Sequence, residues 1–181
     1  MKSFLTILFF VAITAFSTDT VQSQTFPKMD TSPMDLAMAR PDRNTPPIAR
    51  VIYSRPQKNG REIFGELVPY GKVWRTGANE ATELTIYEPL KVNETVLQPG
   101  TYTLYTIPEE DMWTVIINKN ANVWGTVYKK ENDIVRLETP ARNAAAPAES
   151  LSMVFRPENN GATLMIGWDK TYVEVPFEKV K

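Results

Sequence analysis

The chain has 181 residues, of which 43% are hydrophobic and 23% are charged, and its net charge of -1 provides no overall field that would attract nucleic acid. It has no cysteine and no histidine, which excludes structural disulfides, the usual zinc and haem sites, cysteine nucleophiles and serine–histidine triads. We expect no cofactor, no metal and no nucleic-acid partner, although a site of oxygen ligands for a hard cation stays open.

The first residues have the pattern of an export signal. Lys2 precedes the apolar run 4–16, which is too short to span a bilayer comfortably, and Val21 and Ser23 stand just before a suitable cleavage point. We expect residues 1–23 to be a signal peptide and the mature chain to begin at Gln24. The protein would then be periplasmic or extracellular, with no membrane span after cleavage. An uncleaved membrane anchor is the alternative.

Residues 24–47 are polar and contain five prolines, which is typical of an extended arm or linker. Within this arm, residues 34–40 favour one or two helical turns that the flanking prolines would limit. The domain itself is expected to cover residues 48–181.

From Ile48 onward, short apolar runs alternate with turn signals. Asn159-Asn160-Gly161 predicts a tight hairpin, because asparagine and glycine accept positive backbone dihedrals. Asp169-Lys170 is expected to be a turn, and residues 142–150 a crossing loop or a short helical turn. Strands at intervals of about 8–12 residues predict a single all-β domain, an antiparallel sandwich or barrel. The expected strands are 49–54, 63–68 (or a brief helix), 81–87, 90–97, 101–107, 112–118, 123–128, 134–138, 151–156, 162–168 and 171–177.

Residues 53–80 differ from the rest of the chain in having many glycines and arginines and no long periodic run. Four of the eight glycines and three arginines lie there. Glycine supplies backbone angles that other residues resist, and arginine supplies a planar fork that matches carboxylate or phosphate. The pattern predicts an irregular loop on a rigid scaffold, where function tends to lie.

Side chains that could bind a ligand gather in and around this loop. A cationic fork, an amide, a carboxylate and an aromatic ring within 74–80 suit a sugar, a carboxylate or a phosphate ester, and two arginines could together clamp an anion. The alternative is structural: Arg75 and Glu80 pair with each other or with strand ends, and Trp74, like Trp113, Trp124 and Trp168, fills the core. The candidate ligand-binding residues are Tyr53, Arg55, Arg61, Trp74, Arg75, Asn79 and Glu80. Arg55 and Arg75 could form the clamp, and the favoured alternative for Arg55 is a solvated surface position.

The segment Pro69-Tyr70-Gly71-Lys72-Val73-Trp74-Arg75-Thr76-Gly77-Ala78-Asn79-Glu80 resembles the secreted bacterial domain-of-unknown-function 2911 family. The resemblance begins at Tyr53-Ser54-Arg55-Pro56 and continues in Pro99-Gly100-Thr101-Tyr102, Trp113-Thr114-Val115-Ile116, Trp124-Gly125 and Trp168-Asp169-Lys170. It covers residues 48–177. It implies an exported β-rich domain and no activity.

Three functions are compatible with these residues. The first is a module that binds a small polar or anionic ligand, or a partner protein, through the loop. The second is a hydrolase or isomerase with Glu80 as acid or base, in which Arg75 and Asn79 stabilise developing negative charge. The third is a structural envelope protein. A functional site requires these side chains to converge on a cavity, whereas a structural role requires them to be spread apart and individually paired.

Overall fold

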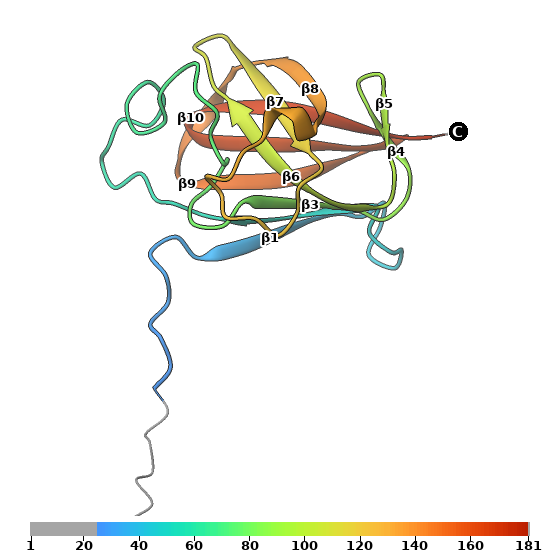
Figure 1. Ribbon diagram of the computed structural model, residues 1–181, viewed down its shortest axis with the longest axis horizontal. Coiled ribbons are helices and arrows are strands. Elements are labelled where there is room, and N and C mark those ends of the chain that lie inside the picture. Colours follow the sequence, from blue (N-terminus) through green and yellow to red (C-terminus); the bar gives the residue numbers. More distant parts are fainter. Residues whose placement is uncertain (1–24, 181) are drawn as a thin grey trace, which may run out of the picture.

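The computed structural model describes residues 25–180, so the predicted signal peptide lies outside the described residues. Two antiparallel sheets pack face to face as a β-sandwich (Figure 1). The expected all-β architecture is confirmed, and of the two expected forms it is the open sandwich. None of the helices formed by residues 25–180 is both long and apolar enough to cross a membrane.

The larger sheet has six strands and the smaller one has four. Every neighbouring pair is antiparallel. The six-stranded sheet contains, in spatial order, β1 (Met34–Ala39), β2 (Ala49–Ser54), β3 (Thr82–Ile86), β6 (Gly100–Ile107), β7 (Met112–Asn118) and β8 (Asp133–Pro140). The four-stranded sheet contains β5 (Thr95–Leu97), β4 (Leu90–Val92), β10 (Gly161–Lys179) and β9 (Arg142–Glu158), and a 3-10 turn, Lys130–Asn132, precedes β8.

The core lies between the two sheets and follows the two-residue period of each strand. In β10 this period changes phase at Asp169, where the register with β9 shifts and φ is 51°. Such a bulge inserts an extra residue, so side chains on either side of it can face the same layer although their spacing is odd. The buried apolar residues of β10 are accordingly Ala162, Leu164, Ile166 and Trp168 before the bulge, and Val173, Val175 and Phe177 after it.

Two expectations for the C-terminal half are wrong for one reason. Asp169-Lys170 is not a turn between two strands, because the bulge lets β10 continue to Lys179. Its partner strand also continues through this irregularity, so residues 142–150 form the first half of β9 rather than a crossing loop. The predicted hairpin at Asn159-Asn160-Gly161 is confirmed, since β9 ends at Glu158 and β10 begins at Gly161.

In the N-terminal half, the proline-rich arm contains a strand where helical turns were expected. Residues 34–39 form β1, which pairs along its whole length with β2. Residues 90–97 form two strands, because Asn93 adopts a positive φ of 52° and turns the chain. Residues 63–68 and 123–128 are not strands, and each keeps only isolated bridges. Both belong to irregular connections, and they form part of the candidate site.

The connection between β2 and β3, residues 55–81, is the longest of the fold. It lies at the end of the sandwich away from the C-terminus and the β4–β5 hairpin (Figure 1).

Candidate functional site

The connection 55–81 is fixed to both sheets by backbone hydrogen bonds. The Lys58 N–H donates to the Glu149 carbonyl at 2.7 Å, and the Leu151 N–H donates to the Pro56 carbonyl at 3.0 Å, which ties the loop to β9. Trp74 exchanges two bonds with Thr106 of β6, at 2.7 and 3.0 Å. The Lys58 ammonium also pairs with the Asp169 carboxylate at the bulge of β10, at 2.6 Å. The loop is therefore held in place by bonds to both sheets of the sandwich.

Thr76 holds an unusual backbone conformation at the centre of this loop. Its φ is 54°, which is rare for a β-branched residue and costs free energy unless the surroundings enforce it. Its buried hydroxyl bonds with the Thr106 hydroxyl at 3.0 Å, and its carbonyl accepts a bond from the Thr82 hydroxyl at 2.8 Å. These contacts fix the chain direction between Trp74 and Gly77.

The loop packs on an aromatic cluster formed by Trp74, Trp168, Phe64 and Trp113. The Trp74 ring is stacked on that of Trp168, with centroids 6.0 Å apart and planes 19° apart, and it meets Phe64 and Trp113 edge-on. The indole N–H groups of Trp74 and Trp168 donate to the carbonyls of Gly77 and Glu149. Trp113 and Trp168 are buried as expected, whereas Trp74 is half-buried. The expectation for Trp124 is wrong, because 53% of that residue is exposed.

A cleft of about 730 Å³ opens over this cluster. Among the described residues that line it, the only charged ones are Arg61 and Arg75, and the others are apolar, aromatic, amide or hydroxyl groups. The cleft therefore combines positive charge with an aromatic wall. It is lined by Thr31, Ser32, Pro56, Gln57, Asn59, Arg61, Leu67, Val68, Trp74, Arg75, Gly77, Ala78 and Trp168.

The two arginines of the cleft differ in how far their donors are used. Arg61 donates from Nε to the Lys58 carbonyl at 2.9 Å and from Nη2 to the Gln57 carbonyl. Within residues 25–180, Arg75 makes no hydrogen bond or ion pair through its side chain, and its Nε is buried. A buried donor without an acceptor is rare in folded proteins. Arg75 thus has hydrogen-bonding capacity that the described fold does not use.

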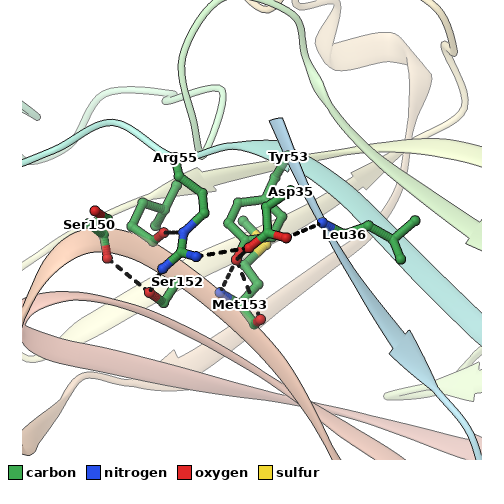
Figure 2. A network of polar contacts seen from close by, with 8 residues as sticks. Asp35, Leu36, Tyr53, Arg55, Ser150, Ser152 and Met153 are labelled. Atoms are coloured by element: carbon green, nitrogen blue, oxygen red, sulfur yellow. Dashed lines mark hydrogen bonds and ion pairs between the residues drawn. The ribbon is translucent and has the colours of Figure 1, made fainter. Parts of the chain in front are cut away.

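Tyr53 and Arg55 join the two sheets and do not line the cleft (Figure 2). The Tyr53 hydroxyl accepts a bond from the Met153 N–H at 2.8 Å, and burial raises the pKa of this phenol. The Arg55 guanidinium binds the Asp35 carboxylate, the Leu151 carbonyl and the Ser152 hydroxyl. Arg55 therefore forms no clamp with Arg75, because its Nε, Nη1 and Nη2 are each bonded to groups outside the cleft.

Asn79 and Glu80 lie apart from the cleft. The side-chain amide of Asn79 donates to the Asp30 carboxylate at 3.3 Å, and the backbone carbonyl of Asn79 accepts a bond from the Gly125 N–H. Glu80 lines a separate cavity of about 400 Å³, together with residues of β2, β3 and β6 and the exposed Trp124. Among the described ion pairs there is none between Arg75 and Glu80, so the expected pairing of these residues is also wrong.

The structure brings together three of the seven predicted residues, namely Arg61, Trp74 and Arg75. Sequence reasoning missed Gln57 and Asn59, which lie inside the predicted loop and carry side-chain amides, and Trp168, which comes from β10. Residues 25–180 contain no cluster of three or more acidic, histidine or cysteine side chains that could hold a metal ion.

Comparison with protein-family models gives one match, over residues 33–177, to the family described as "Protein of unknown function (DUF2911)". No curated protein and no solved structure matches the chain.

Proposed function

Because the chain belongs to the DUF2911 family of proteins of unknown function, which provides no activity to transfer, we propose a function from the cleft: the domain binds a small anionic ligand with a ring-shaped body. The observation that carries the proposal is Arg75, whose buried Nε has no acceptor within the described fold. Because this Nε has almost no accessible surface, a bound anion would be held by the Nη groups of the same guanidinium, which also make no hydrogen bond within residues 25–180.

The charge of the cleft supports an anion rather than a neutral ligand. Arg61 and Arg75 are its charged lining residues, and arginine matches the two oxygens of a carboxylate or the oxygens of a phosphate better than lysine does. Arg61 already donates to two backbone carbonyls, whereas no donor of the Arg75 side chain has an acceptor among the described residues, so Arg75 has the greater capacity for the ligand.

The walls of the cleft support a ligand with a flat or ring-shaped body. Trp74 is half-buried and its ring is held by the stack on Trp168 and by the bond to the Gly77 carbonyl. A ring fixed in this way binds a ligand face without losing further side-chain freedom. The amides of Gln57 and Asn59 and the hydroxyls of Thr31 and Ser32 supply polar contacts at the rim.

The arrangement of Glu80 gives no support to the hydrolase or isomerase alternative. A general acid or base must reach the same bound substrate as the group that stabilises charge. Glu80 and Arg75 line different cavities, and the described lining of the cleft contributes no carboxylate of its own. A binding module is therefore the function that we propose.

Thermal melting with single ligands tests the proposal. The probes are galacturonate, benzoate and inorganic phosphate, with glucose as the neutral comparison. We expect at least one anion to raise the Tm of the wild type and glucose to have no effect. Arg75→Ala should abolish that shift, whereas Arg43→Ala, which removes an exposed arginine outside the cleft, should keep it. A wild type that no anion stabilises, or an equal shift in both variants, would contradict the proposal.

We further propose that this binding occurs outside the cytoplasm. The support is the lysine followed by a short apolar run at the start of the chain. Intact-mass measurement of protein recovered from the cell exterior or periplasm should show a chain that begins at Gln24. A retained Met1 in exported material would refute this proposal.

A further inference from the structure

Another cavity, also of about 400 Å³ but distinct from the one that Glu80 lines, lies beside the cleft and shares Trp74 and Arg75 with it. It is called the second cavity below. Its lining also includes Tyr105 of β6 and Gly125, Thr126 and Tyr128 from the connection between β7 and β8. The segment Trp74-Arg75 therefore forms a ridge with one cavity on each side. This ridge is rigid, because Trp74 is bonded to Thr106 through both its N–H and its carbonyl.

Gly125 allows Arg75 to lie along this ridge. A Cβ atom at Gly125 would stand 2.3 Å from Cδ of Arg75 and 2.7 Å from the Asn79 carbonyl oxygen, which is closer than real Cβ contacts come. The side chain of Arg75 thus occupies space that only glycine leaves free. Arg75 is a lining residue of both cavities, and its Nε is buried without an acceptor among the described residues.

Besides the shared Trp74, the lining of the second cavity includes one half-buried aromatic ring, that of Tyr128, and the exposed Thr126, whereas Tyr105 is buried. The rings of Tyr105 and Tyr128 meet edge-on, with centroids 5.1 Å apart. Their hydroxyls already donate, that of Tyr105 to the Val127 carbonyl at 3.0 Å and that of Tyr128 to the Asp133 carboxylate at 2.6 Å. A half-buried aromatic ring therefore lines each cavity, that of Trp74 in the cleft and that of Tyr128 in the second cavity, and Arg75 lines both.

We propose that the two cavities are subsites of one groove and that its ligand is an acidic oligosaccharide. A carboxylate on an inner sugar unit binds Arg75, and the neighbouring units lie in the cleft and in the second cavity. A pyranose ring has an apolar C–H face, which packs on an aromatic ring, and a polar rim, which suits amides and hydroxyls. This inference rests on the proposed anion-binding function of the cleft.

Calorimetry with galacturonate, trigalacturonate and the neutral trimer maltotriose tests the inference. We expect one trigalacturonate to bind per protein, at least about tenfold more tightly than galacturonate, because the second subsite is engaged without a second loss of translational freedom. Maltotriose should bind more weakly than trigalacturonate, since it lacks the carboxylate.

Two variants separate the subsites. Thr126→Phe places a ring in the second cavity from an exposed position, and Val127→Phe adds the same ring one residue further on, outside that cavity. Thr126→Phe should reduce trigalacturonate binding to the level of galacturonate and leave galacturonate binding unchanged. Val127→Phe should bind like the wild type. Melting in the absence of ligand checks that both variants are folded.

The outcomes distinguish the inference from the function on which it rests. If galacturonate binds in an Arg75-dependent manner but the trimer gains nothing, or if Thr126→Phe has no effect, the inference is overturned and anion binding stands. Two galacturonate molecules per protein with no gain for the trimer would show two separate sites and also overturn it. If benzoate or phosphate binds and neither uronate does, an acidic oligosaccharide is not the ligand and the inference is overturned. If no anion binds, the proposed function fails as well.

Discussion

Arg55, which directly follows β2, pairs with Asp35 of β1, and its Nη1 lies 2.9 Å from the Asp35 Oδ2. The same guanidinium also reaches β9 (Figure 2). There it donates from Nε to the Leu151 carbonyl at 3.0 Å and from Nη2 to the Ser152 hydroxyl at 2.9 Å. β1 and β2 belong to one sheet and β9 belongs to the other. One side chain therefore connects both layers of the sandwich.

Truncating Arg55 should weaken the fold more than neutralising its partner. Arg55→Ala removes three hydrogen bonds and leaves the Leu151 carbonyl without this donor, so we expect a loss of about 1–3 kcal/mol in the free energy of unfolding. Asp35→Asn weakens only a half-exposed ion pair, for which about 0–1 kcal/mol is expected. Urea denaturation measures both values. Equal losses in the two variants would show that the contacts with β9 contribute little.

Tyr53→Phe should destabilise the protein without affecting the cleft. The phenol oxygen accepts the Met153 N–H at 2.8 Å in a buried position, and its removal leaves that donor unsatisfied at a cost of about 1–3 kcal/mol. Urea denaturation gives the loss, and the ligand-induced shift in Tm should stay that of the wild type at saturating ligand. A variant that loses this shift while still folded would place Tyr53 in the binding machinery.

Gly125→Ala should impair ligand binding although residue 125 itself brings no group that would bind an anion. The added methyl group clashes with Arg75 and with the Asn79 carbonyl, and such overpacking costs about 1–3 kcal/mol. Arg75 must move to relieve the clash, so binding should weaken further than the loss of stability explains. Thr126→Ala, at an exposed neighbouring position, should change stability by no more than about 0.5 kcal/mol. Full ligand affinity in Gly125→Ala would contradict the proposed role of Arg75.

The stability contributed by Tyr128 should disappear between about pH 10 and pH 12. Burial has the largest effect and the hydrogen bond to Asp133 the next largest, and together they raise the pKa of Tyr128 from 10.0 to about 12. The folded state therefore favours the neutral phenol, and the stabilisation is complete below the unfolded pKa and is lost as the pH rises through the folded pKa. Denaturant unfolding at several alkaline pH values should show a steeper decline for the wild type than for Tyr128→Phe.

The titration of tyrosinate absorbance checks the same shift directly. The difference between wild type and Tyr128→Phe removes the signal of the other tyrosines, and its midpoint should lie at about 12. A midpoint near 10 would show that the contact with Asp133 does not persist in solution.

Thermal unfolding should be the same with and without a chelator. The chain has no cysteine or histidine, and residues 25–180 contain no cluster of acidic side chains suited to a cation. Structural metal sites contribute folding free energy directly, so removing one lowers the Tm. A fall of several degrees on adding chelator would reveal a cation site of oxygen ligands.

The sequence predicts those parts of the fold that depend on local chemistry. Asn159-Asn160-Gly161 marks its hairpin correctly, because the required backbone angles are a property of these residues alone. The bulge at Asp169 is not visible in this way, since a short polar pair between two apolar runs reads equally well as a turn. β1 was missed because its alternate residues are exposed, and its stability comes from pairing with β2 rather than from its own composition.

The same limit applies to the candidate site. The loop was located from its glycines and arginines, but which arginine is free depends on partners that are distant in sequence. Arg55 is occupied by Asp35 and by β9, whereas Arg75 has no partner among residues 25–180. Trp168 enters the cleft only because the register of β10 turns it inward. Side chains that share a cavity can be identified only after the strands are placed.

The bulge in β10 also fixes how long that strand must be. Before Asp169 the inward residues are even-numbered and after it they are odd-numbered, so losing a single residue there would remove the bulge and put both halves of the strand into one regular alternation. Because Asp169 also pairs with Lys58, the same deletion would release the loop that carries the cleft. Insertions and deletions among natural variants of this chain should therefore avoid this position, even though it is polar and reads as a turn.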